Sequence, residues 1–321
     1  ITRKLLTGPV MSLRTAFTRD GNIAYEGVRN IIDAGIAGGS KTVMLTVGDS
    51  HYDILSDDEI AEMTRVAVEH TAGRAMVIAA DRYHGTERAQ AFATFAKETG
   101  ADMVMCHPPD WAQSTTPETL SEHYAAVAEI IPVMIVTNRF IPRGEAFGLE
   151  TLERTLDASP NVLAVKDDMC GRFAQKMAAA LHERCALIAG GRKRNHLNMH
   201  HYGCDGYLST FVAMKTDVTA RYWKSIQAGN YSRAARIVSE QDGPFFDYVT
   251  AQTGNFDACM HGMLELNGLA TRYRRKPYYT LNEREIQQLE EKLLHLNLLN
   301  DGHAKGPDRK STRLNSSHYR T

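Results

Sequence analysis

The stretch Asn161-Val162-Leu163-Ala164-Val165-Lys166-Asp167-Asp168 decides the fold. Its apolar run, residues 162–165, is typical of a parallel strand that is buried on both faces. Lys166 follows directly, and the end of a strand is where a parallel α/β barrel carries its chemistry. Burial there disfavours the ammonium form, so the neutral amine can attack a ketone or an aldehyde. The simpler interpretation is that Lys166 ends the strand and pairs with Asp167 or Asp168.

Similar apolar runs recur along the chain and alternate with helical patterns. The other strand-like runs are Pro9–Leu13, Thr42–Leu45, Ala75–Ala79, Met103–Cys106, Val133–Val136, Ala186–Ala189 and Gly206–Leu208. Eight strands that alternate with helices of about 10–15 residues predict parallel βαβ units and a closed (β/α)8 TIM barrel. An open doubly wound sheet is the alternative, but the GxGxxG loop expected after its first strand is absent.

The strand signals stop near Tyr222, and only helical patterns follow, over Phe245–Asn267 and Asn282–Leu296. We therefore expect residues 1–221 to form the barrel and residues 222–299 to form a C-terminal helical subdomain. Residues 300–321 are polar and hold few large apolar side chains, so they bury too little surface to offset the entropy of ordering. We expect them to be a tail that is disordered or foreign to the fold.

The composition excludes several classes of protein. The chain has 321 residues, 43% of them hydrophobic, and a net charge of −1, which is ordinary for a globular protein. There is no basic block that would indicate nucleic-acid binding, and no apolar run of the roughly 20 residues that cross a bilayer. The five cysteines lack paired spacing and no signal peptide is visible, so we expect a cytoplasmic protein without structural zinc.

Short motifs occur along the chain in an order that points to one family. They are Phe17-Thr18-Arg19-Asp20-Gly21-Asn22-Ile23, Leu55-Ser56-Asp57-Asp58-Glu59, Pro160-Asn161-Val162, Val165-Lys166-Asp167, Gly203-Cys204-Asp205-Gly206-Tyr207-Leu208-Ser209 and Leu264-Glu265-Leu266-Asn267-Gly268-Leu269. With these motifs, residues 5–298 resemble the dihydrodipicolinate synthase / N-acetylneuraminate lyase family of class I barrel enzymes. The resemblance implies that Lys166 forms a Schiff base with a small carbonyl compound, that no cofactor takes part, and that the protein is a homo-oligomer, a dimer or a tetramer.

The chain departs from the family after the second strand. The family carries G-T-T-G-E there and holds the substrate carboxylate with it. An ungapped register places Gly48, Asp49, Ser50 and His51 at the last four of those positions, and we expect them to bind substrate. Asp49 would then have to be protonated, turned away or facing another group, because like charges repel. A gapped register would place Thr46 in the site instead.

A second departure follows the fifth strand, where the family has a tyrosine that relays protons. Thr137 stands at that position and Asn138 at the asparagine beside it, so the resemblance assigns both to catalysis with Lys166. Arg143 and Arg192 are candidates to bind a distal carboxylate or hydroxyls, and Leu208, in the motif of the last strand, is a further candidate for substrate contact.

Polar residues at the strand ends leave other functions open. Asp49, His51, Asp81 and His107 all follow predicted strands, and such ligands suit Zn²⁺, Mn²⁺ or Mg²⁺. No strong ligand motif occurs, so we expect no metal. We expect a Schiff-base-forming lyase, an aldolase or dehydratase, that acts on a small 2-oxo acid, sugar acid or aldehyde. The alternatives are a catalytically altered family member that binds or regulates, and a metal-dependent barrel enzyme.

Overall fold

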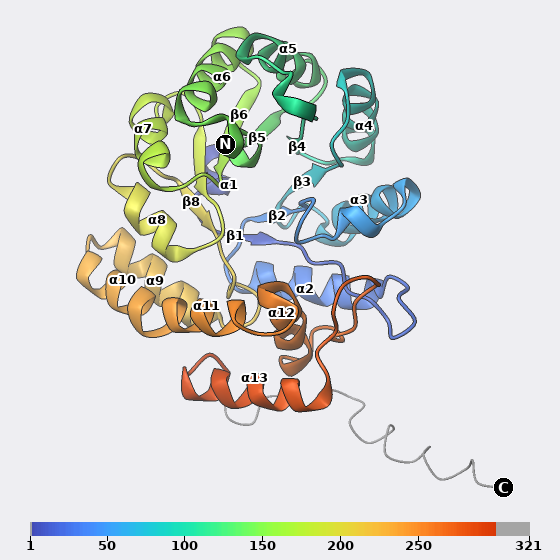
Figure 1. Ribbon diagram of the computed structural model, residues 1–321, viewed down its shortest axis with the longest axis vertical. Helices are drawn as coiled ribbons and strands as arrows, with labels where there is room; N and C mark the ends of the chain where they lie inside the picture. Colours follow the sequence, from blue (N-terminus) through green and yellow to red (C-terminus); the bar gives the residue numbers. More distant parts are fainter. Residues whose placement is uncertain (1, 300–321) are drawn as a thin grey trace, which may run out of the picture.

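A computed structural model describes residues 2–299. Eight parallel strands form one closed barrel in chain order, and the last strand pairs with the first (Figure 1). The strands are β1 (Gly8–Ser12), β2 (Thr42–Met44), β3 (Met76–Ala80), β4 (Met103–Cys106), β5 (Val133–Val136), β6 (Val162–Asp167), β7 (Ala186–Ala189) and β8 (Gly206–Leu208). The prediction of a (β/α)8 TIM barrel is confirmed.

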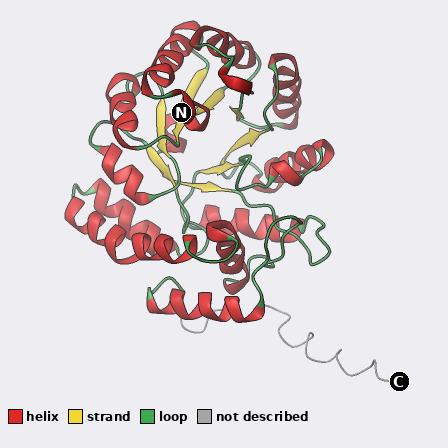
Figure 2. Cartoon of the chain, in the orientation of Figure 1, coloured by secondary structure: helices red, strands yellow, loops and turns green. Residues whose placement is uncertain are grey.

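Helices connect successive strands and surround the barrel, as Figure 2 shows. They are α2 (Tyr25–Ala37), α3 (Asp57–Thr71), α4 (Thr86–Thr99), α5 (Pro117–Ala128), α6 (Glu145–Ala158), α7 (Gly171–Leu181) and α8 (Lys193–His200). Three short 3₁₀ helices, η1 (Tyr52–Ile54), η2 (Trp111–Gln113) and η3 (Thr137–Arg143), follow β2, β4 and β5. The polar residues after these strands therefore lie in short, tightly turned segments at one end of the barrel.

The sequence analysis did not predict α1 (Thr2–Leu6), which precedes the first strand. Its chain passes so close to β8 that a Cβ added at Gly206 would lie 2.1 Å from the carbonyl oxygen of Leu6. Gly8, which also has a φ of +106°, pairs with Gly206 where β1 and β8 meet. Glycine at these positions allows the barrel to close against the N-terminal segment.

Helix α3 begins with a capping box formed by Ser56 and Glu59, both in the motif of residues 55–59. The Ser56 hydroxyl accepts a hydrogen bond from the Glu59 amide, and the Glu59 carboxylate accepts one from the Ser56 amide, at 3.2 and 2.9 Å. This arrangement satisfies two amides that helix geometry leaves without partners. Arg275 donates to the same carboxylate at 2.7 and 2.8 Å, so this helix start also anchors the C-terminal segment.

Beyond β8 the chain is mainly helical up to residue 295, with a longer non-helical segment at residues 267–282. Its elements are α9 (Thr216–Gln227), α10 (Tyr231–Ile237), the π-helical turn η4 (Val238–Asp242), α11 (Gly243–Thr250), α12 (Asn255–Leu266) and α13 (Glu283–His295). The continuous pattern expected over residues 245–267 is broken between α11 and α12, because Gly254 adopts a left-handed φ of 74° that ends regular helix. Apolar spacing continues across the break, so the pattern alone does not reveal it.

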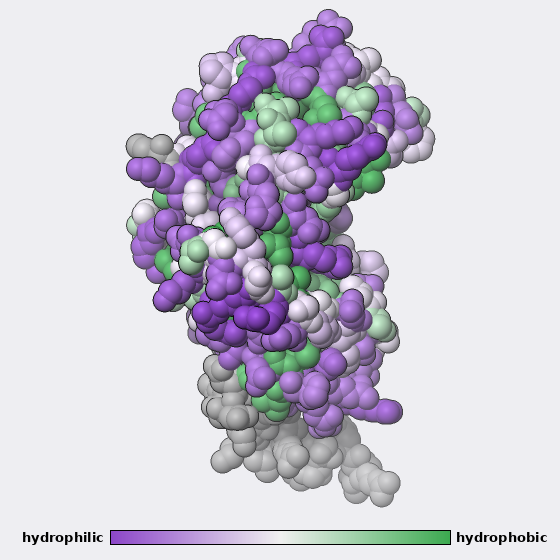
Figure 3. Space-filling model, turned by 90° about the vertical axis from the view of Figure 1, so that its left-hand side faces the viewer, coloured by the Kyte–Doolittle hydropathy of each residue, from purple (hydrophilic) through white to green (hydrophobic). Residues whose placement is uncertain are grey.

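The sequence predicts that the barrel ends at residue 221 and the C-terminal helical subdomain begins at residue 222. Helix α9 runs through this point, so the division stays a prediction. The expected tail, residues 300–321, lies outside the described residues. Within residues 2–299 no helix is long and apolar enough to cross a membrane. The face in Figure 3 is mainly hydrophilic, with scattered hydrophobic residues, as is usual for a protein surface.

Candidate active site

Lys166 lies near the carboxyl end of β6 and is 7% exposed. Its Nζ donates hydrogen bonds to both carboxylate oxygens of Asp168, at 2.6 and 2.7 Å. A buried ammonium without a partner would be very unfavourable, and this carboxylate compensates it. The simpler interpretation of the sequence, a lysine paired with an aspartate, is thus structurally correct for Asp168, and it also leaves the amine beside a group that can take its proton.

Glycine at position 190 allows this pair to form. A Cβ added there would lie 2.0 Å from Oδ1 of Asp168 and 2.5 Å from the carbonyl oxygen of Asp167. The Gly190 amide instead donates to that carbonyl at 2.7 Å. The end of β7 is therefore packed directly against the segment that carries Asp168.

Asp167 points to a different set of partners. Its carboxylate accepts hydrogen bonds from the Thr137 hydroxyl at 2.9 Å and from the Met169 and Cys170 amides at 3.1 and 3.0 Å. Burial raises the pKa of Asp167 although these hydrogen bonds oppose the change. The Thr137 hydroxyl in turn accepts from the Asp168 amide at 2.8 Å. Thr137 thus fixes the segment that carries Asp168, and its own hydrogen is directed to Asp167.

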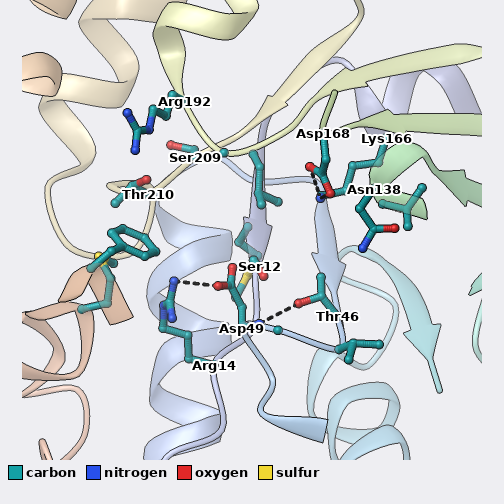
Figure 4. A pocket seen from close by; sticks show the side chains of 18 of the residues that line it. Ser12, Arg14, Thr46, Asp49, Asn138, Lys166, Asp168, Arg192, Ser209 and Thr210 are labelled. Atoms are coloured by element: carbon teal, nitrogen blue, oxygen red, sulfur yellow. Dashed lines mark hydrogen bonds and ion pairs between the residues drawn. The ribbon is translucent and has the colours of Figure 1, made fainter. Parts of the chain in front are cut away.

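A cavity of about 470 Å³ opens beside Lys166. The strand ends form part of its wall, and Phe246, Thr250, Phe256 and Met260 of α11 and α12 form another part. Of the residues that the sequence analysis assigned to the site, those that line the cavity are Gly48, Asp49, Asn138, Lys166, Arg192 and Leu208. Oδ1 of Asn138 is buried and has no hydrogen-bond partner within residues 2–299, so it is available to a ligand. Figure 4 shows Asn138 beside Lys166 and Asp168.

Four assigned residues, Thr137, Ser50, His51 and Arg143, do not line the cavity. Arg143 donates to Asp110 at 2.8 Å and to the carbonyl oxygen of Thr115 at 3.0 Å. The Ser50 hydroxyl donates to the Leu13 carbonyl at 2.6 Å. These contacts shape loops around the site, so direct substrate contact by these two side chains has no support in the geometry.

The loop after β2 places both Thr46 and Asp49 in the cavity wall. The Asp49 amide donates to the Thr46 hydroxyl at 3.1 Å, and the Asp49 carboxylate accepts from Arg14 at 2.9 Å. Asp49 therefore faces a guanidinium group, which is one of the three possibilities that its charge left open. Thr46, the residue of the gapped register, and Asp49, from the ungapped one, lie together in this loop.

Arg14 was missed by the sequence analysis, although a charged residue directly after the apolar run 9–13 was a usable signal. It is buried, lines the cavity and donates to Asp257 of α12 at 2.6 Å. Figure 4 shows its other contact, with Asp49. Arg274 also donates to Asp257. Burial would raise the pKa of Asp257, but the hydrogen bond from His51 and the charge of Arg14 outweigh it and hold this pKa below its usual range.

His51 lies behind this ion-pair network. Its Nε2 is 3.2 Å from Oδ2 of Asp257 and 3.2 Å from Nε2 of His261. These three side chains are the only group within residues 2–299 whose spacing suits a metal ion. Both oxygens of Asp257 already accept hydrogen bonds from arginines, so a cation there would lie beside two guanidinium groups and be repelled. We interpret the cluster as part of the ion-pair network.

His107, another strand-end residue, does line the cavity. Burial lowers the pKa of His107 to about 3, and the positive charges of Lys166 and Arg139 lower it further. The imidazole is therefore neutral near pH 7 and adds no charge to the site. Asp81, the remaining candidate for a metal ligand, pairs with His84 at 3.3 Å and does not line the cavity.

Comparison with known proteins identifies the family. The model of the Dihydrodipicolinate synthetase family matches residues 5–296, so the chain belongs to this family. A probable 5-dehydro-4-deoxyglucarate dehydratase 1 from Streptomyces coelicolor is 24% identical over 88% of this chain and 90% of its own length. A 4-hydroxy-tetrahydrodipicolinate synthase from Sorangium cellulosum is 30% identical over 72% of this chain and 78% of its own.

Other matches are partial or structural. The 4-hydroxy-tetrahydrodipicolinate synthase from Azoarcus sp. is 29% identical, but the match spans only 51% of this chain and 56% of that protein. Among solved structures, N-acetylneuraminate lyase from Fusobacterium nucleatum has a TM-score of 0.79 at 15% identity, covering 92% of this chain and all of that one (100%). At that identity the likeness establishes the fold. The named relatives are synthases, a dehydratase and a lyase, and no single substrate is common to their names.

Proposed function

We propose that this protein is a class I lyase, an aldolase or dehydratase, in which Lys166 forms a Schiff base with a small 2-oxo acid, sugar acid or aldehyde. The observation that carries the proposal is the buried pair of Lys166 and Asp168 on the wall of a cavity of about 470 Å³. A lysine amine in such a place needs only a proton acceptor to become a nucleophile.

Asp168 supplies that acceptor. One proton passes from the ammonium group of Lys166 to Asp168, and the nitrogen lone pair attacks the carbonyl carbon of the substrate. One proton moves from the attached nitrogen to the former carbonyl oxygen, which gives a carbinolamine. Its hydroxyl group then leaves as water with the proton that Asp168 returns. The product is a protonated imine, which accepts an electron pair from a neighbouring C–C or C–H bond.

The loop after β2 is suited to the carboxylate of a 2-oxo acid. The amides of Val47 and Gly48 have no acceptor within residues 2–299, and both residues line the cavity. Successive free amides form a concave site that favours anions. The Thr46 hydroxyl accepts from the Asp49 amide, so its own hydrogen is available to the same carboxylate. The ion pair with Arg14 compensates the negative charge of Asp49. Without it, Asp49 would repel the carboxylate of the substrate.

Within the class, dehydration is the first reaction to assay. The Streptomyces relative that is named a probable dehydratase aligns with 88% of this chain, whereas the Azoarcus synthase aligns with 51%. We also retain the expectations of a cytoplasmic homo-oligomer. Trp111 and Ile141 are 88% and 55% exposed on the loops after β4 and β5, and contact with a second copy would remove this apolar surface from water.

Borohydride trapping tests the proposal. Wild-type protein incubated with a series of 2-oxo acids and aldehydes and then reduced should gain the mass of one substrate less one oxygen atom, on a peptide that contains Lys166. Lys166→Met should gain nothing, and Lys176→Met, a change of an exposed lysine on α7, should behave as the wild type. Carbonyl compounds that bind but never add mass would support the alternative of a binding or regulatory protein.

A further inference from the structure

The charges on the cavity wall are unevenly paired. Three cationic side chains line the cavity, Arg14, Lys166 and Arg192. Arg14 is bound to Asp49 at 2.9 Å, and Lys166 is bound to Asp168 at 2.6 Å. No carboxylate of residues 2–299 lies within ion-pair distance of Arg192. The cavity therefore presents one guanidinium group whose counterion the protein itself does not provide.

Arg192 is held in place without an ionic partner. It directly follows the loop after β7, and its guanidinium carbon lies 4.3 Å from the centre of the Phe246 ring of α11. A cation over an aromatic face is attracted by the ring, and stacking also limits the conformations of the side chain. The five donors of the guanidinium group stay free for another acceptor.

Hydroxyl groups from the next strand lie on the same side. Ser209 and Thr210 follow β8 and line the cavity, and the Thr210 hydroxyl has no hydrogen-bond partner within residues 2–299. In Figure 4 these two residues and Arg192 lie on one side of the cavity, while Lys166, Asp168 and Asn138 lie on the other. The unpaired cation is therefore separate from the group that would form the imine.

One acidic residue of the wall remains to be considered. Asp53 also lines the cavity, but it lies in η1 after β2. Strands β1 and β8 separate β2 from β7 around the barrel, so Asp53 enters the cavity from a different sector than Arg192. Among the ion pairs of residues 2–299, none joins Asp53 to Arg192.

We infer that Arg192, with Ser209 and Thr210, binds a second anionic group of the substrate, and that the substrate is a 2-oxo diacid whose far carboxylate pairs with Arg192. A single guanidinium group can donate two parallel hydrogen bonds to the two oxygens of a carboxylate. A phosphate carries a larger negative charge, and the described cavity wall has no second unpaired cation to compensate it. This inference rests on the proposed function, in which the carbonyl at the near end reacts with Lys166.

The test uses three matched compounds, a six-carbon 2-oxo-3-deoxy sugar acid that ends in a carboxylate, the same compound ending in a hydroxymethyl group, and one ending in a phosphate ester. Binding is measured by calorimetry in the wild type and in Lys166→Met, which cannot form an imine. The diacid should bind at least about tenfold more tightly than the hydroxymethyl compound in both proteins, as expected for one charge-assisted contact.

Arg192→Gln should reduce this preference at least about tenfold, whereas Arg194→Gln, a change of the exposed arginine two positions later, should retain it. Equal binding of the diacid and the hydroxymethyl compound, or a preference that survives Arg192→Gln, would overturn the inference. Tighter binding of the phosphate ester would overturn the assignment to a carboxylate. Loss of borohydride trapping with all compounds, while the preference persists in Lys166→Met, would instead contradict the Schiff-base function and leave the anion site standing.

Discussion

Arg14, two residues beyond β1, and Asp257, in α12, are joined by a hydrogen bond of 2.6 Å although 243 positions separate them. The same guanidinium group holds Asp49 on the cavity wall. Helix α12 thus contributes a charge to the network behind the candidate site, and α11 and α12 form part of its wall.

Asp257→Asn should destabilise the folded protein by about 3 kcal/mol, because it leaves Arg14 and Arg274 without their shared carboxylate. Urea unfolding monitored by circular dichroism measures the change. Asp247→Asn, a change of an exposed aspartate on α11, should have almost no effect. Equal stability of the two variants would show that the ion pairs of Asp257 do not hold the C-terminal helical subdomain against the barrel.

The same carboxylate predicts how stability depends on pH. The pKa of Asp257 is lowered in the folded protein, so its ionised form stabilises the fold above the unfolded pKa of about 3.9. This contribution is lost as the pH falls below that value toward the folded pKa. Urea midpoints recorded from pH 6 down to pH 2 should therefore converge for wild type and Asp257→Asn at the acid end. A constant difference over that range would contradict the prediction.

Asp168→Asn keeps the shape of the side chain but removes the proton acceptor of Lys166. Imine formation, followed by rapid quenching with borohydride, should slow by about 10²-fold, a usual contribution of a positioned acid or base. Unimpaired trapping in Asp168→Asn would mean that another group takes the proton.

Thr137→Val distinguishes support of the site from proton relay. Loss of the hydroxyl leaves the Asp167 carboxylate and the Asp168 amide each short of a buried hydrogen bond, so stability should fall by about 1–3 kcal/mol. We expect a smaller loss of imine formation than in Asp168→Asn. A large loss of imine formation with unchanged stability would instead support the hypothesis that the Thr137 hydroxyl relays protons.

Gly190→Ala should disable the site through sterics, because the new methyl group overlaps Oδ1 of Asp168. We expect trapping to fall about as far as in Asp168→Asn, with a cost to stability of about 1–3 kcal/mol. Gly85→Ala is the matched control, since no heavy atom lies within 4 Å of the added carbon and its φ is −62°. Similar behaviour of the two variants would rule out the proposed clash.

Much of the fold was predictable because each buried strand is a short apolar run between polar segments. The runs 103–106, 133–136, 186–189 and 206–208 match β4, β5, β7 and β8 residue for residue. The break before α12 was not predictable from periodicity, because a single glycine conformation interrupts a pattern that continues on both sides.

The candidate site was predictable only in part. Lys166 ends an apolar run, so its position at the carboxyl end of β6 could be derived from the local sequence. The partners of Arg14 depend on how α12 packs against the barrel, and no local pattern encodes that packing. The direction of the Thr137 hydroxyl likewise depends on the turn after β6. The roles of the individual site residues stay predictions until the variants are measured.

The position of α11 and α12 in the cavity wall has a consequence for how the protein is made. The ribosome completes the barrel strands, and with them Lys166, before it adds the helices that carry Phe246 and Asp257. A nascent chain that ends before α12 has an amine but lacks part of the substrate chamber and one of the two partners of Arg14. Under the proposed function, a complete site therefore forms only after these last helices have been synthesised.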